Sequence, residues 1–169
     1  IVDGGVYLTH PDLSFWKNWY EIPGNNIDDD NNGYIDDVNG WNAFNNNGNI
    51  TGNNHGSHCS GIAGAIGNNT IGVAGVNWNI KSMAVMGSST TEAVVVRAYG
   101  YCVRQRKVYD QTNGQRGAFV VVTSSSFGVD YGQPQNYPLW CAFYDSLGTA
   151  GILSAGATAN LNINIDVTG

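Results

Sequence analysis

The sequence predicts an α/β fold with a mostly parallel sheet and helices on both of its faces. Strand-like and helix-like segments alternate along the chain, which favours right-handed crossovers between parallel strands. Gly117–Thr123 (GAFVVVT) is a continuous apolar run, typical of a strand that is covered on both faces. Gly, Ala and Ser fill the segment Ser57–Ile66, so a helix there can pack closely on a sheet.

The N-terminal half contains one strand end, long loops and one helix. Ile1-Val2-Asp3 is predicted to end a buried strand, and this strand is short enough to be cut at its N-terminal side. Residues 14–50 are rich in Asn, Asp and Gly and are predicted to form loops, with a short apolar piece at Gly40–Phe44. A helix follows His55 and covers Ser57–Ile66.

The C-terminal half continues the alternation. Besides the strand Gly117–Thr123, its elements are a strand, two helices and a last buried strand, at Lys81–Met86, Thr90–Lys107, Pro138–Leu147 and Ile152–Ala157. Thr90 or Thr91 is the expected N-cap of the longer helix, with Glu92 in its first turn.

Composition excludes several classes of protein. The 169 residues carry a net charge of -6, and a pI near 4.6 argues against a nucleic-acid partner. No apolar run approaches the ~20 residues that span a bilayer, so we expect no membrane partner. The opening residues lack the basic start of a signal peptide. Three cysteines are too few for a disulfide scaffold.

Polar side chains follow the ends of several predicted strands. Asp3, Ser124–Gly128 and Asn160 each come at or just after such an end, and His55 begins a helix. In a parallel sheet these positions meet at one edge, where ligands bind. A carboxylate there can fix the tautomer of a histidine and stabilise its protonated form.

Four segments resemble the subtilisin-like serine proteases, in that family's order and over nearly the whole chain. IVDGGVYLTHPDL is similar to the aspartate segment, and NNHGSHCSGIAGAIGNNTIGVAGV to the histidine segment and the loop after it. VVVTSSSFG resembles the substrate-binding strand, and GILSAGATAN the strand that leads to the oxyanion asparagine.

The resemblance implies roles for individual residues. Asp3 would orient the general base His55, His58 would be a structural neighbour, and Asn160 would donate its side-chain amide to the oxyanion. A peptide would add as a strand to the segment that lines the primary pocket, which is Ser124, Ser125, Ser126, Phe127 and Gly128.

The sequence also departs from the family pattern. The family's nucleophile lies in a Gly-Thr-Ser motif beyond the oxyanion asparagine, and no such motif occurs here. We therefore expect residues 1–169 to be a partial peptidase domain whose serine belongs to a missing C-terminal part. Gly4 replaces the hydroxyl residue usual after the aspartate, and Ala159 stands where glycine is usual.

An acidic loop is the first candidate calcium site. Asp28, Asp30, Asn32, Tyr34 and Asp36 occupy alternate positions of a loop whose sharp turn falls at a glycine, a spacing of oxygen ligands that suits calcium. Asp37 could supply a further carboxylate. The alternative is a solvated acidic turn, but five carboxylates within ten residues repel one another without a cation.

A second calcium site is implied by the resemblance alone. The segment after the histidine helix is similar to the family's strong calcium loop. Its ligands would be the side chains of Asp12 and Asn69 and the carbonyls of Gly67, Ile71 and Val73. Without the family, a plain Gly/Asn turn is the simpler interpretation.

Three smaller features complete the expectations. Cys59 is expected to be a buried free thiol near the histidine, whereas Cys102 and Cys141, on two predicted helices, are open to pairing. The basic residues of Arg97–Arg116 are expected to form a solvated helix face.

The function expected from these observations is a secreted or cell-surface, calcium-stabilised serine endopeptidase acting on protein or peptide substrates. One alternative is an inactive protease-like module that binds calcium and peptides. Another is a metal hydrolase that uses His55, His58 and an acid as ligands.

Overall fold

The fold is built on one parallel sheet. The computed structural model describes residues 1–161. Five strands lie in the order β2-β3-β1-β4-β5, with every pairing parallel. Their bounds are β1 Val2–Asp3, β2 Gly40–Asn42, β3 Ala84–Met86, β4 Val122–Ser125 and β5 Leu153–Gly156. Val2 pairs with Val85 on one side and with Ser125 on the other, so β1 is central. This confirms the predicted α/β fold with a parallel sheet.

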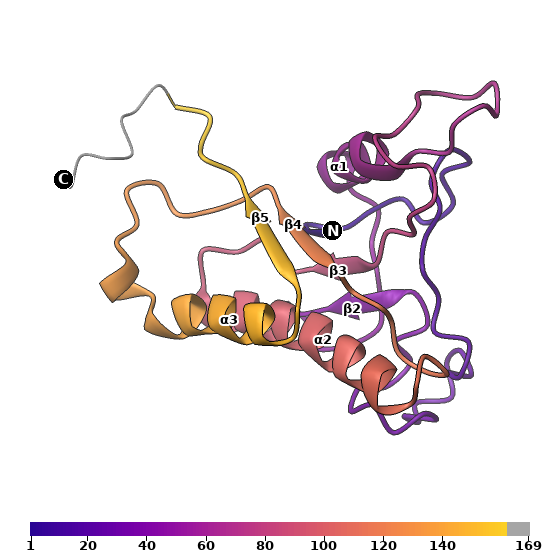
Figure 1. Ribbon diagram of the computed structural model, residues 1–169, viewed down its shortest axis with the longest axis horizontal. Coiled ribbons are helices and arrows are strands. Elements are labelled where there is room, and N and C mark those ends of the chain that lie inside the picture. Colours follow the sequence, from indigo (N-terminus) through magenta and orange to yellow (C-terminus); the bar gives the residue numbers. More distant parts are fainter. Residues whose placement is uncertain (162–169) are drawn as a thin grey trace.

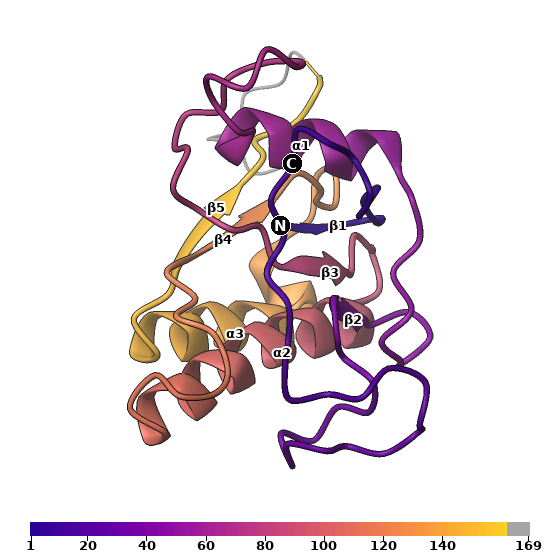
Figure 2. The ribbon, with the colours of Figure 1, turned by 90° about the vertical axis from the view of Figure 1, so that its right-hand side faces the viewer.

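Helices cover both faces of the sheet, as the alternation predicts. The helices are α1 Asn54–Gly64, α2 Glu92–Gln111 and α3 Pro138–Thr149, with a short 3-10 turn at Pro134–Asn136. Figures 1 and 2 show α1 on one face, while α2 and α3 lie side by side on the other. None of the helices in residues 1–161 is both long and apolar enough to cross a membrane.

The core lies between the sheet and the long helix α2. Val95, Ala98, Tyr99, Cys102 and Val103 are all buried, at the i, i+3, i+4, i+7, i+8 spacing of one helix face. This stripe packs in one cluster with apolar side chains of the strands and of α3, namely Val2, Trp41, Val85, Trp140 and Leu147.

Several element bounds differ from those expected. Helix α2 runs four residues past Lys107 and ends at Gln111. The next residue, Thr112, donates its hydroxyl to Val108 O at 2.7 Å. Thr91 is the N-cap, but its side chain makes no capping bond. The apolar run at 117–123 contributes to strand β4 only from Val122.

The expected burial of the last two strands holds only in part. Thr123 and Ile152 are buried, but other apolar side chains of these segments are not. Phe119 is 57% exposed, Val122 45% and Leu153 71%. These side chains lie towards the β4–β5 side of the sheet, where β5 is the edge strand and α3 is the helix that packs most against it. A continuous apolar run therefore does not by itself guarantee cover on both faces.

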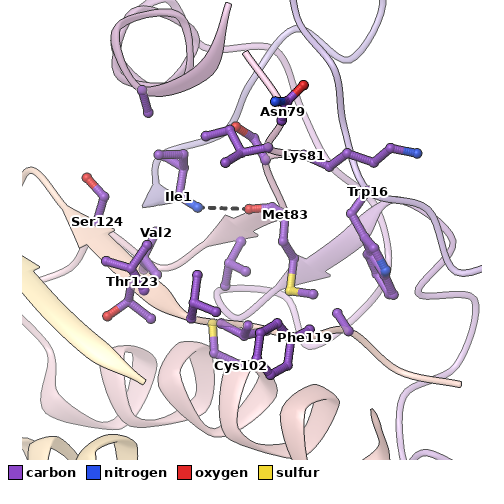
Figure 3. A pocket seen from close by; sticks show the side chains of 18 residues that line it. Ile1, Val2, Trp16, Asn79, Lys81, Met83, Cys102, Phe119, Thr123 and Ser124 are labelled. Atoms are coloured by element: carbon purple, nitrogen blue, oxygen red, sulfur yellow. Dashed lines mark hydrogen bonds between the residues drawn. The ribbon is translucent and has the colours of Figure 1, made fainter. Parts of the chain in front are cut away.

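A largely apolar cavity of about 410 Å³ lies at the end of the sheet where the strands begin. Figure 3 shows Ile1, Met83 and Phe119 in its wall, with Ile1 N donating to Met83 O at 2.9 Å. Ser124 also lines this cavity, whereas Asp3 and His55 do not.

Candidate active site

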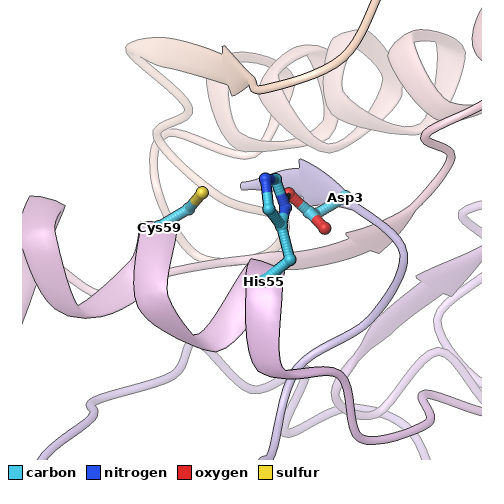
Figure 4. Close-up of side chains that lie close together, drawn as sticks. All are labelled: Asp3, His55 and Cys59. Atoms are coloured by element: carbon cyan, nitrogen blue, oxygen red, sulfur yellow. Dashed lines mark hydrogen bonds and ion pairs between the residues drawn. The ribbon is translucent and has the colours of Figure 1, made fainter. Parts of the chain in front are cut away.

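An aspartate and a histidine from distant parts of the chain meet at the other end of the sheet. Asp3 ends β1 and is buried, and its Oδ2 lies 2.8 Å from Nδ1 of His55 in the first turn of α1. Asp3 Oδ1 accepts a second hydrogen bond from Gly4 N at 2.7 Å. The carboxylate is thus fixed on both oxygens, while the histidine side chain remains 60% exposed. Figure 4 shows the His55 ring beside the Asp3 carboxylate.

Local backbone geometry holds the histidine in place. The side chain of Asn53, the N-cap of α1, accepts hydrogen bonds from His55 N at 2.8 Å and Gly56 N at 3.3 Å. Gly56 is required because a Cβ there would lie 2.1 Å from Gly5 O, a backbone atom that cannot move aside cheaply. The helix start can therefore approach the turn after β1 closely enough for the two side chains to touch.

The expected substrate segment divides into two parts. Ser125 is buried, and its hydroxyl pairs with the Tyr99 hydroxyl at 3.0 Å, so this side chain belongs to the core. Phe127 also packs against the core, with its ring 5.9 Å from that of Trp140. Ser126 instead faces the histidine helix, where Cys59 Sγ lies 3.4 Å from its Oγ.

Among residues 1–161, no strand pairs with the backbone of the residues just after β4. The β4–β5 ladder ends at the pairing of Ser125 with Gly156, and only Ala157 N continues it to Ser125 O. A Cβ added at Gly128 would meet no atom within 4 Å, so the space beside it is open. Asn160 lies exposed in the bend beyond β5.

The arrangement expected of a two-histidine metal hydrolase is not found among the described residues. His58 is exposed, and the group of potential metal ligands that contains His55 is completed by Asp3 and Cys59 rather than by His58.

The acidic loop brings carboxylates together, but not in the pattern expected. Oxygens of Asp28, Asp30 and Glu21 lie within 4.8 Å of one another. Asp36 points elsewhere, because its two oxygens accept from Gly24 N at 2.7 Å and Asn26 N at 3.1 Å. Glu21 was missed from the sequence because it precedes the loop by seven residues and belongs to no ligand spacing.

Asp37 is fully buried and serves a hydrogen-bond network. Its carboxylate accepts from Asn18 at 2.7 Å, Asn32 at 3.1 Å, Tyr101 at 2.8 Å and Gln105 at 2.7 Å. Burial raises the pKa of Asp37 to about 6, although the hydrogen bonds from Asn18, Tyr101 and Asn32 oppose the shift. The carboxylate therefore joins the loop to helix α2, which supplies the tyrosine and the glutamine.

The basic residues form the expected solvated face only in part. Arg97 and Lys107 are exposed, but three of the guanidinium groups also donate to backbone carbonyls. Arg104 Nε donates to Asn32 O at 2.7 Å, and Arg116 donates to Asp30 O at 2.8 Å. Arg97 donates to Ala43 O at 3.0 Å. These guanidinium groups bind carbonyls of the loops beside α2, and charge spacing along a helix gave no sign of such distant partners.

The second expected calcium loop also gathers around a buried carboxylate. Asp12 accepts from Asn69 Nδ2 at 2.8 Å and from Val73 N at 2.9 Å, and these two hydrogen bonds lower its pKa. Gly72 has φ +54°, and a Cβ there would lie 2.2 Å from Asp12 Oδ2. Asn69 therefore presents its amide N–H, not its oxygen, to the aspartate.

All three cysteines are free. The pairing of Cys102 with Cys141 that the sequence left open is absent, because Cys102 is buried in the core and Cys141 Sγ contacts Pro134 O at 3.7 Å. Burial raises the pKa of the Cys102 thiol to about 11. Cys59 is half-buried rather than buried.

Comparisons with known proteins agree with this arrangement. Subtilisin-like protease 1 of Plasmodium berghei is 53% identical over 85 residues, which are 48% of this chain and 14% of that protein. The Plasmodium falciparum protein of the same name is 49% identical over 85 residues and 12% of its length, and thermitase of Thermoactinomyces vulgaris is 36% identical over 100 residues and 29% of its length. The chain thus spans under a third of each relative. Because a profile of the subtilase family matches residues 1–163, the chain belongs to the subtilase family.

Proposed function

We propose that the chain carries the general base, the orienting acid and the oxyanion donor of a serine endopeptidase. The observation that carries this proposal is the 2.8 Å contact between a buried aspartate and the first-turn histidine at the ligand-binding edge of the sheet. Its nucleophile would be a serine outside these 169 residues, since the sequence holds no Gly-Thr-Ser motif.

The proposed reaction is acyl transfer. The serine attacks the peptide carbonyl while His55 Nε2 takes its proton and then returns it to the leaving amine. Asp3 keeps the other ring nitrogen protonated and stabilises the imidazolium. The side-chain amide of Asn160 donates to the tetrahedral oxyanion, a contact whose loss costs about 10²–10³ in kcat in subtilisin, a relative of this chain.

A substrate peptide would pair with the free backbone that follows β4. This backbone belongs to Ser126, Phe127 and Gly128, which lie past the last β4–β5 pairing. Cys59 of α1 contacts Ser126 at one side of it. Main-chain hydrogen bonds in this mode give affinity for extended peptides, and pockets for alternate side chains give specificity. Ser124 and Ser125 would then support the strand and not contact the substrate through their hydroxyls.

Residues 1–169 alone lack the serine and should be inactive, so the test uses the full-length protein. It is labelled with a fluorophosphonate and assayed for hydrolysis of an unstructured protein such as casein. We expect both, and we expect His55→Ala to abolish both while His58→Ala, its exposed neighbour on α1, retains them. Peptide binding without labelling or hydrolysis would replace this proposal with an inactive peptide-binding module.

We further propose that calcium stabilises two loops. At the first, three carboxylates within 4.8 Å fit a hard cation, with Glu21 in place of the more distant Asp36. At the second, Asp12 would bind the ion with Asn69 turned to present its oxygen and with carbonyls of Gly67, Ile71 and Val73. The ions would supply structural charge neutralisation and take no part in the reaction.

Calcium binding is tested by thermal unfolding with calcium and with a chelator. A ligand at 100 times its Kd stabilises a fold by about 2.7 kcal/mol, so the midpoint should rise by several degrees. Asp28→Asn and Asp12→Asn should each remove part of this rise, whereas Asp110→Asn, on the exposed end of α2, should remove none. Sites of this kind suit the calcium concentrations outside cells, which favours a secreted or cell-surface protein, and fractionation of the source cells would test that location.

A further inference from the structure

A thiol lies beside the histidine proposed as general base. Cys59 follows His55 by four residues on α1, so both side chains leave the same helix face. One ligand atom from each of Asp3, His55 and Cys59 lies within 4.8 Å of the others. Figure 4 places the sulfur on the side of the imidazole away from Asp3. The peptidase chemistry proposed above makes no use of this thiol.

The chemistry of the three groups suits a borderline metal ion. Thiolate sulfur and neutral imidazole nitrogen are the preferred zinc ligands in proteins, whereas calcium prefers oxygen. Asp3 occupies Nδ1 of the ring, which leaves the lone pair of Nε2 free for a metal. A carboxylate behind a metal-binding histidine is also the usual outer support of such a site.

The ligand atoms of the group lie within 4.8 Å of one another. Zinc–sulfur and zinc–nitrogen bonds of ~2.3 and ~2.0 Å place the two atoms about 3.5 Å apart around a tetrahedral ion. The half-buried cysteine, whose Sγ lies 3.4 Å from Ser126 Oγ, would turn away from this contact to bind the ion. Among residues 1–161 no fourth His, Cys, Asp or Glu joins the group, so water would complete the coordination.

We propose that His55 Nε2 and Cys59 Sγ form an inhibitory zinc site. Zinc takes the lone pair of the neutral imidazole and displaces the thiol proton, so each ion bound releases one proton and nothing is oxidised or reduced. The same lone pair is the one that accepts the serine proton in the proposed reaction. Zinc and catalysis therefore exclude one another, and the inhibition rests on the proposed function, whereas the binding itself does not.

Cobalt(II) provides a test of binding that needs no activity. With calcium in excess to saturate the acidic loops, titration of the purified protein with cobalt should produce a thiolate-to-cobalt charge-transfer band in the near ultraviolet, which zinc then removes. Cys59→Ala and His55→Ala should lose the band, while the matched variants Cys141→Ala and His58→Ala should keep it. No band in the unmodified protein, or a band that survives Cys59→Ala, would overturn the site.

Zinc inhibition then tests its consequence. The zinc concentration that halves hydrolysis should rise at least tenfold in Cys59→Ala relative to the unmodified protein and stay unchanged in Cys141→Ala. Equal zinc sensitivity of the two variants would overturn the inhibitory role even where the cobalt band is present. A protein that hydrolyses nothing yet gives the band would refute the proposed function and leave the metal site standing.

Discussion

The substitution Asp3→Asn tests the pairing at the centre of the candidate site. It keeps the size of the side chain and removes the charge that faces His55 Nδ1 at 2.8 Å. At an effective dielectric constant of ~20, opposite unit charges at this distance attract by about 6 kcal/mol, or about four powers of ten in rate at ~1.36 kcal/mol each. The histidine is 60% exposed and the aspartate side chain 4%, so solvent screens part of this attraction.

We therefore expect kcat/KM for peptide hydrolysis to fall by about 10²–10⁴ in Asp3→Asn, a range whose upper end matches the loss of about 10⁴ known for this change in an unrelated serine peptidase. The matched control is Asp110→Asn, which removes a carboxylate whose only ion pair is with Arg106 on the surface of α2. Both variants should unfold cooperatively in thermal denaturation. A loss below tenfold in a folded Asp3→Asn protein would refute the role of Asp3 as the orienting acid.

Three further predictions concern stability and reactivity. Gly40→Ala should lower the free energy of unfolding by at least about 2 kcal/mol, since φ is +126° and a Cβ would lie 1.9 Å from Ala84 O. The matched variant Gly148→Ala in α3 meets no atom within 4 Å and should raise the free energy of unfolding by up to about 1 kcal/mol. Arg104→Met should cost about 1.5–3 kcal/mol in the same denaturant titration, because it leaves the Asn32 carbonyl without its charged donor; an unchanged midpoint would show the contact to be dispensable. The raised pKa of Cys102, about 11, keeps its thiol protonated, so a thiol-reactive dye should modify it only after unfolding. Because the folded state holds that proton more tightly than the unfolded state, the free energy of unfolding should fall as pH rises from ~9 towards 11.

The parts that sequence predicts well are those fixed by local pattern. Alternation of apolar and polar segments gives the order of strands and helices, and the carboxyl-edge rule brings Asp3 to His55 before any coordinates are known. The need for glycine at position 56 is not part of this local pattern, because it arises only from the close approach of Gly5 O in the folded chain.

The parts that sequence misses depend on partners far along the chain. Glu21 reaches the acidic loop through a fold-back that no spacing rule describes, and Arg116 binds a carbonyl 86 residues away. Burial fails for a similar reason. The apolar run before β4 predicts a strand covered on both faces, yet exposure of Val122 depends on which neighbours pack against it. Such contacts are properties of the assembled sheet and not of the segment.

The two proposed metals bind at separate places in the fold, and the network around Asp37 determines which part of the sheet calcium would stabilise. Calcium at the acidic loop would tighten a segment that α2 already holds through Tyr101 and Gln105, and that leads directly into β2 at Gly40. β2 is an edge strand, two positions from the central β1 that ends in Asp3. Loss of calcium should therefore loosen the β2 edge first and lower the unfolding midpoint. The cobalt affinity at His55 should stay the same as long as the sheet remains folded. If chelation of calcium lowered the cobalt affinity at low temperature together with the unfolding midpoint, the loop and the active site would form a single cooperative unit.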